Sequence, residues 1–220
     1  MTTKRRYDDG CASAHALDLV GERWALLVVR ELLFGPKRFT DLRAGMPGAS
    51  PNVLSQRLRE LEEAGVLRRR KLAPPASARV YELTPWGREL EPVILALGRW
   101  GVRSPGLHRD GGIGVDSVML ALKALFDPDL AGGLEAELAV RMGDDGFEVR
   151  LSDGLTIRRG EPDRPHAVLT TDPRTLNGLL WDDLPLAEAE ATGEATVIGD
   201  RSLVERFLRM FPLPAPAVVA

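Results

Sequence analysis

Residues 39–79 constrain the fold of this chain more than any other segment, because they predict a short helix, a turn, a second helix and a basic β-hairpin in close succession. At about 100° per residue, the second helix has a polar face that carries Asn52, Ser55, Gln56 and Arg59. Its opposite face carries Leu54, Leu58 and Leu61. Amide, hydroxyl and guanidinium groups read base edges in the DNA major groove, whereas leucines anchor a helix to a core. The pattern therefore predicts a DNA-binding helix.

The flanking segments complete a winged helix-turn-helix. Ser50 is a suitable N-cap for the second helix, Pro51 fits its first position and Gly65 ends it. Before it we expect helices at 13–20, 22–34 and 39–44, the second buried because it is apolar nearly all round. After it we expect strands at 66–72 and 79–83 and a helix from residue 85 to about 100, kinked at Pro92. In this geometry the N-terminal part of the recognition helix enters the major groove.

Basic residues surround this helix. We expect those of the hairpin to contact phosphate or the minor groove rather than form only a solvated face, although alternation along a strand prevents all of them from touching DNA. Arg57, on the flank of the polar face, is either a phosphate contact or a structural ion pair, and Lys37 and Arg38 are either backbone contacts or solvated. The complete expected interface is Lys37, Arg38, Ser50, Asn52, Ser55, Gln56, Arg57, Arg59, Arg68, Arg69, Arg70, Lys71 and Arg79.

Charge divides the chain into two halves. Residues 1–105 carry 18 Lys and Arg against 12 Asp and Glu, whereas residues 106–220 carry 11 against 20. The basic half suits a polyanion and the acidic half repels one. Residues 105–114 are rich in glycine and lack periodicity. We therefore expect a DNA-binding domain at 1–104, a linker at 105–113 and a second domain at 114–220.

The number of cysteines and the length of the apolar runs indicate the cellular compartment of the protein. Cys11 is the single cysteine, which favours a reducing environment. The N-terminus has no apolar signal-peptide core, and the longest apolar run, residues 24–29, is far shorter than the ~20 residues of a membrane span. We expect a cytoplasmic protein with no membrane partner.

Several segments, in order, resemble the HxlR-type winged-helix regulators, which are relatives of the MarR group. The resemblance covers residues 11–101 and rests on the cysteine before the first helix, then LVGERWALLVVRELLFGPKRFTDL, LSQRLRELEEAGVLRR, VYELTPWGRELEPV and LGRWG. It implies a homodimeric bacterial transcription factor whose terminal helices pair the subunits. Such a two-fold dimer requires a pseudo-palindromic operator with half-sites about one helical turn apart.

An apolar stripe on the last helix of this half is a candidate for the dimer interface, and its alternative is packing within one subunit. The stripe consists of Leu90, Val93, Ile94 and Leu97.

The same resemblance points to Cys11 as a redox sensor, because several members of the family sense oxidants or electrophiles at this position. A helix N-terminus and the cations at residues 4–6 favour the reactive thiolate, whereas Asp8 and Asp9 oppose it. The alternative is an inert, partly buried thiol.

The second half predicts five strands and several helices, and with them an α+β class built on an antiparallel or mixed sheet with covering helices. Asp145-Gly146 and Asp153-Gly154, between alternating runs, indicate hairpin turns. We expect strands at 136–142, 147–151, 155–159, 167–171 and 195–198, and helices at 115–126, 173–181, 187–191 and 201–211.

This half resembles the sterol-carrier-protein fold, most specifically in AVLTTDPRTLNGLLWDDLPLAEAEATGEATVIGDRSLVERFLRMF. The resemblance implies an apolar cavity for a lipid-like molecule. Its candidate lining residues are Leu176, Leu180, Trp181, Leu203, Phe207 and Phe211. The alternative is that these side chains fill a core.

No feature indicates catalysis or a cofactor. His15, His108 and His166 are scattered, and the chain contains no nucleophile elbow, P-loop or dinucleotide-binding fingerprint. The carboxylate pairs 144–145 and 182–183 are expected in solvated turns. We expect a DNA-binding repressor whose second domain serves as an effector or dimerisation module. The competing hypothesis is a carrier of an apolar small molecule that uses its winged helix only to dimerise.

Overall fold

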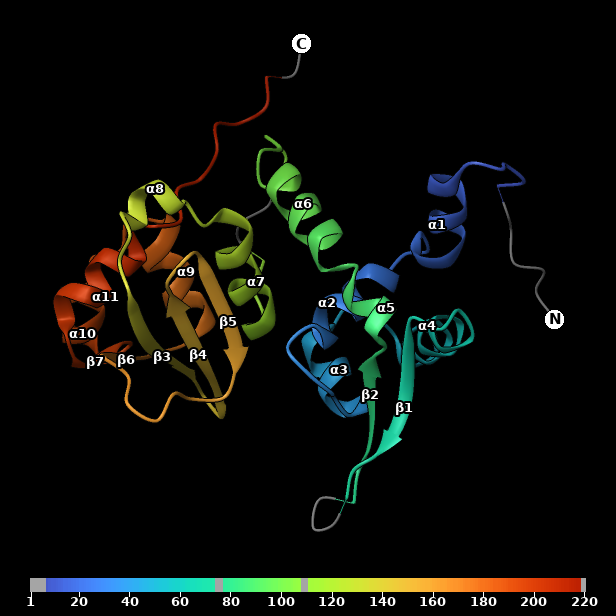
Figure 1. Ribbon diagram of the computed structural model, residues 1–220, viewed down its shortest axis with the longest axis horizontal. Helices are drawn as coiled ribbons and strands as arrows, with labels where there is room; N and C mark the ends of the chain where they lie inside the picture. Colours follow the sequence, from blue (N-terminus) through green and yellow to red (C-terminus); the bar gives the residue numbers. More distant parts are fainter. Residues whose placement is uncertain (1–6, 74–76, 108–110, 219–220) are drawn as a thin grey trace. The chain divides into compact units, whose positions relative to one another are not determined.

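A computed structural model describes residues 7–73, 77–107 and 111–218. The chain divides into two compact units, Met1–Ile94 and Leu95–Ala220, and Figure 1 labels the elements of each. The helix α6 contributes to both, since it spans Glu91–Gly101.

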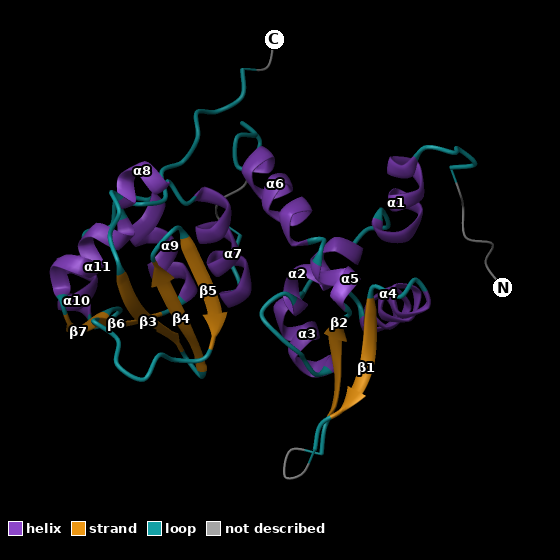
Figure 2. Ribbon diagram, viewed as in Figure 1, coloured by secondary structure: helices purple, strands orange, loops and turns teal. Residues whose placement is uncertain are grey.

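Unit 1 has the predicted element order of a winged helix-turn-helix (Figure 2). A cluster of buried aliphatic side chains from its helices and the root of the hairpin forms its core. The elements are α1 Ala12–Val20, α2 Ala25–Leu32, α3 Phe39–Gly45, α4 Pro51–Glu63, β1 Leu67–Lys71, β2 Arg79–Leu83 and α5 Pro85–Arg88.

Local chemistry sets the ends of α4 as expected. The Ser50 hydroxyl accepts a hydrogen bond from the backbone N–H of Val53 at 3.4 Å, and Pro51 occupies the first turn. At the other end Gly65 has a φ of +73°, a left-handed conformation that costs glycine little.

Two predicted helices in unit 1 were wrong in extent. The helix expected at 22–34 begins only at Ala25, because Trp24 before it has a φ of +79°. The helix expected from residue 85 to 100 is two helices, α5 and α6, separated at residues 89–90. Pro92 does not kink a helix here, since it lies in the first turn of α6, where a missing N–H breaks no intrahelical bond.

Unit 2 is built on a five-stranded mixed sheet with strand order β5-β4-β3-β6-β7, in which β3 and β6 are parallel and the other pairs antiparallel. The helix α7 packs on β5, and α11 packs on β6 and β7. The strands are β3 Ala136–Met142, β4 Asp145–Leu151, β5 Leu155–Arg159, β6 Ala167–Thr171 and β7 Thr196–Gly199. The helices are α7 Val115–Leu125, α8 Pro128–Ala131, α9 Pro173–Trp181, α10 Leu186–Thr192 and α11 Arg201–Leu208.

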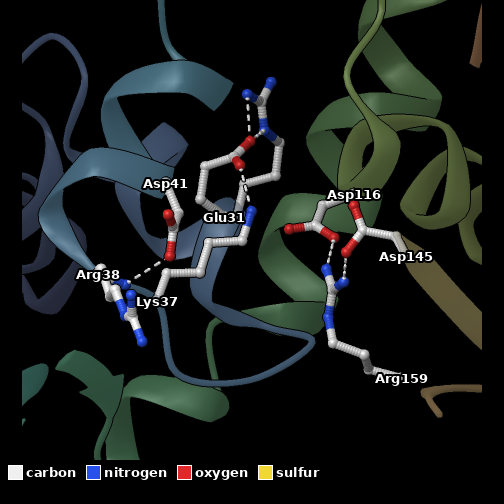
Figure 3. Close-up of polar contacts among 8 residues, drawn as sticks. Glu31, Lys37, Arg38, Asp41, Asp116, Asp145 and Arg159 are labelled. Carbon is white, nitrogen blue, oxygen red and sulfur yellow. Dashed lines mark hydrogen bonds and ion pairs between the residues drawn. The ribbon is translucent and has the colours of Figure 1, made fainter. Parts of the chain in front are cut away.

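The first hairpin turn of unit 2 was predicted two residues too late. Met142 faces Asp145 in the β3–β4 register, so residues 143–144 make the turn and Asp145 lies in β4. Gly143, with a φ of +61°, provides the backbone conformation that a tight hairpin needs. Asp145 is therefore no solvated turn residue: its carboxylate pairs with Arg159, which also pairs with the buried Asp116 (Figure 3).

No helix in the described parts of the chain is long and apolar enough to cross a membrane.

Candidate nucleic-acid interface

The helix α4 separates polar and apolar side chains as the sequence predicted. Asn52, Gln56 and Arg59 are exposed and Ser55 is half-buried. The leucines of the opposite face, Leu54, Leu58 and Leu61, are each at most 1% exposed. The Gln56 amide donates a hydrogen bond to Glu60 at 3.0 Å, one turn further along the helix. The polar face thus presents amide and guanidinium groups on a helix whose other side is fixed in the core.

Arg57 does not belong to this exposed set. Its guanidinium pairs with Glu60 on the same helix and with Glu22 at 3.5 Å, and only 11% of its side chain is exposed. Of the two roles considered from the sequence, the geometry supports the structural ion pair, because a phosphate contact needs an accessible guanidinium.

Lys37 is similarly engaged within the fold (Figure 3). Its Nζ lies 2.7 Å from Oε2 of Glu31, whose side chain is 3% exposed and is also bound by Arg30 at 2.8 Å. The neighbouring Arg38 has an exposed side chain, and its backbone N–H donates to Asp41 at 3.1 Å. Of these two predicted backbone contacts, Arg38 therefore has the accessible side chain.

The hairpin divides its cations between two faces. Arg68 and Arg70 point to one side and both pair with Glu82, at 2.7 Å and 2.9 Å. On the other side Arg69 pairs with Glu62 of α4 at 2.8 Å and lies over the ring of Tyr81. Neither Glu62 nor Glu82 was expected from the sequence as a partner of these arginines. In the β1–β2 register Glu82 lies opposite Arg68. The alternation of side chains along strand 79–83 was the feature of the sequence from which this pairing could have been considered.

Lys71 and Arg79 differ from the other hairpin cations. They face each other in the β1–β2 register and both are exposed. Within the described chain neither has an acidic partner, and like charges placed opposite each other in a sheet repel. An anion bound between them would relieve that repulsion.

Cys11 is exposed at the N-terminal end of α1. Hydrogen bonds from the backbone N–H of Ser13 and then of Ala14 lower the pKa of the Cys11 thiol, which favours the thiolate. Asp9 accepts a hydrogen bond from the Cys11 N–H at 2.9 Å. The cations at residues 4–6 that were expected to act on Cys11 lie outside the described residues.

The six candidate pocket residues of unit 2 do not line one cavity. Leu176, Leu203 and Phe207 are buried in the core, and the Trp181 indole donates to the carbonyl of Phe211 at 2.8 Å. An open groove of about 590 Å³ is lined by the C-terminal end of α9, the start of α10 and one side of α11. Leu180 and Phe211 line it but none of the other four does, and its wall also carries Asp183, Arg201, Glu205 and Arg209.

The predicted apolar stripe contains both half-buried and exposed side chains, and Leu90 precedes α6. Leu90 and Ile94 pack against the core of unit 1, whereas Val93 is 46% and Leu97 48% exposed. Trp100, which was not included in the predicted stripe, is 75% exposed. Val93, Leu97 and Trp100 recur at helical spacing and form an exposed apolar face of α6.

The described parts of the chain contain no candidate metal site. In these parts no group of three His, Cys, Asp or Glu side chains could hold a metal ion. His108, one of the histidines considered from the sequence, lies outside these parts.

Comparison with known proteins identifies relatives of the first half. The profile of the HxlR-like helix-turn-helix family matches residues 19–106. The chain is 40% identical over 92 residues to the uncharacterized HTH-type transcriptional regulator sll1512 of Synechocystis sp., covering 41% of this chain and 67% of the relative. It is 40% identical over 86 residues to the uncharacterized HTH-type transcriptional regulator YvaP of Bacillus subtilis, covering 39% of this chain and 79% of the relative. Among solved structures, the redox regulator HypR in its oxidized form is 32% identical with a TM-score of 0.40, covering 44% of this chain and 100% of that one.

Proposed function

Because the chain belongs to the HxlR-like helix-turn-helix family and is a transcriptional regulator of that type, we propose that it binds a specific double-stranded DNA operator through α4 and the β1–β2 hairpin. The observation that carries this proposal is the exposed polar face of α4, with Asn52, Gln56 and Arg59, above leucines that are fully buried.

Each exposed group on α4 has a preferred base. Arg59 suits the O6 and N7 acceptors of guanine, and Asn52 or Gln56 suits adenine. Lys71 and Arg79 on the hairpin supply phosphate contacts, which add affinity without sequence preference. Arg57 and Lys37 take no part, since internal carboxylates occupy them.

We propose that the protein is a homodimer that acts on a pseudo-palindromic operator. The apolar face of α6 supports this, together with α1, on which Leu17 is 47% exposed. Soluble proteins rarely leave contiguous apolar patches uncovered. A second copy of the chain, bound by these helices, would cover both.

We propose further that the protein is a repressor without enzymatic activity. Its affinity for DNA would be controlled by sites outside α4. Unit 2 would act as a sterol-carrier-protein-like effector module, with the groove lined by Leu180 and Phe211 as the site for a small apolar molecule. Cys11, exposed and with a lowered thiol pKa, would be the second input.

The decisive experiment is selection of bound genomic fragments by the purified full-length protein, with and without a thiol oxidant. We expect one enriched, inverted-repeat motif, and its loss with Arg59→Ala. A protein that enriches no fragment, yet binds an apolar fluorescent probe, would favour the carrier hypothesis and overturn this proposal.

A further inference from the structure

Glu82 lies beneath two arginines of the hairpin. Its side chain is 7% exposed, whereas those of Arg68 and Arg70 are 63% and 49% exposed. Each arginine reaches the carboxylate through its Nε atom, one to Oε1 at 2.7 Å and the other to Oε2 at 2.9 Å. Both carboxylate oxygens therefore have a partner. Glu82 on β2 links Arg68 and Arg70, which lie two residues apart on β1.

This arrangement leaves the outer edges of the guanidinium groups available. Arginine has five N–H donors in a planar fork. Arg68 uses its Nε–H in a hydrogen bond to Glu82, and Arg70 forms an ion pair with the same carboxylate. The terminal nitrogens of Arg68 and Arg70 can therefore bind further acceptors while the carboxylate keeps both guanidinium groups on one face of the hairpin. Arg68, Arg70 and Glu82 together carry a net charge of +1, whereas the two arginines alone would carry +2.

We infer that Glu82 is a specificity-determining residue for DNA binding, which positions Arg68 and Arg70 and cancels one of their charges. The inference rests on the proposed operator binding. Attraction between cations and the phosphate backbone is independent of sequence, so a hairpin with one charge fewer binds random DNA more weakly. Guanidinium groups that are already placed lose less rotational freedom on binding the operator. The loss of one charge acts on operator and random DNA alike, whereas the positioning of the two guanidinium groups favours the operator, where their contacts are fixed, and so raises the ratio of operator affinity to random affinity.

The test compares Glu82→Gln with wild-type full-length protein on the selected operator and on random DNA, over a series of salt concentrations. Removing one negative charge should steepen the slope of log K against log salt by about 0.9, and should raise affinity for random DNA about fivefold at 0.15 M salt, the factor for one additional released counterion. Operator affinity should rise less, so the specificity ratio falls. A merely structural role predicts weaker binding to both DNAs at an unchanged slope.

Two further variants make the result decisive. Arg68→Gln leaves the pair of Arg70 with Glu82 and should make the slope shallower than wild type, even if Glu82→Gln folds poorly. Glu161→Gln in unit 2, whose carboxylate pairs with Arg141, changes the protein's net charge equally and should leave the slope unaltered. An unchanged slope in both hairpin variants overturns only the inference about Glu82. Wild-type protein that prefers no DNA fragment overturns the proposed function, and the inference with it.

Discussion

Lys37 and Glu31 form an ion pair, with 2.7 Å between Nζ and Oε2, although the Glu31 side chain is only 3% exposed. The same lysine exchanges two backbone hydrogen bonds with Tyr81 of β2, at 3.0 Å and 2.8 Å. One residue therefore joins the core helix α2 to the hairpin. The hairpin is anchored by this contact, so its cations have a fixed position relative to α4.

Glu31→Ala should destabilise the protein strongly. Removing the buried carboxylate leaves Arg30 and Lys37 without their common partner, and breaking a buried ion pair costs about 3–5 kcal/mol. Chemical denaturation of the variant measures this. Glu161→Ala, which breaks an exposed pair with Arg141, should cost at most about 1 kcal/mol. Equal losses in the two variants would show that Glu31 contributes no more than a surface pair.

Arg59→Ala and Gln56→Ala should each lower discrimination at one operator position by about 1–3 kcal/mol, because each removes a direct base contact. Binding to operators with single base changes, measured by competition, locates the position. Arg57→Ala provides the control on the same helix: we expect it to lower the midpoint of thermal unfolding while operator preference is preserved. Loss of preference in Arg57→Ala, with unchanged stability, would contradict its assignment as an ion pair.

Lys71→Ala and Arg79→Ala should weaken binding to all DNA sequences alike. If each residue contacts one phosphate, the slope of log K against log salt should become shallower by about 0.9 per substitution. Filter binding at several salt concentrations measures the slope. Arg158→Ala removes an exposed arginine of unit 2 and serves as the charge control. A slope that responds equally to all three variants would indicate an effect of net charge rather than of phosphate contact.

Leu97→Glu should convert the proposed dimer into a monomer. A carboxylate within an apolar interface must be desolvated without a partner, which costs several kcal/mol. Sedimentation velocity separates the two states, and operator affinity should fall with dimerisation. Leu130→Glu changes a leucine of α8 that is 52% exposed and should leave the oligomeric state as it is. A dimer that survives Leu97→Glu would exclude this face of α6.

Alkylation of Cys11 should stay fast at a lower pH than alkylation of a free thiol. The hydrogen bonds from Ser13 and Ala14 at the start of α1 lower the pKa of Cys11, so the thiolate persists as the pH falls until that lowered pKa is passed. The pH dependence of the iodoacetamide reaction, followed by mass spectrometry, gives the pKa. In a second assay Cys11→Ser should abolish any oxidant-dependent loss of DNA binding; an unchanged loss would remove Cys11 as the sensor.

Much of the fold followed from local chemistry. The cap at Ser50, followed by proline, predicted the start of α4 correctly, and the helix expected from residue 173 begins there as α9, with Asp172 as its N-cap. The breaks between helices were harder to predict from the sequence. Trp24 adopts a left-handed conformation although it is not a glycine, and Pro92, expected to kink one long helix, lies instead in the first turn of a new one.

The sequence by itself determined which groups α4 exposes, because helical periodicity and the positions of three leucines leave only one side for the core. It also determined that the hairpin is basic and that the second half contains a five-stranded sheet. Only the tertiary structure decided which cations are available. Lys37 and Arg57 are held by carboxylates and largely covered. Arg68, Arg69 and Arg70 are paired but keep exposed guanidinium groups, and Arg59, Lys71 and Arg79 have no acidic partner in the described chain. The reason is physical: an ion pair depends on a distance of a few ångströms, and that distance is set where helices, strands and loops meet in the folded unit, as for Lys37 with Glu31 and Arg69 with Glu62.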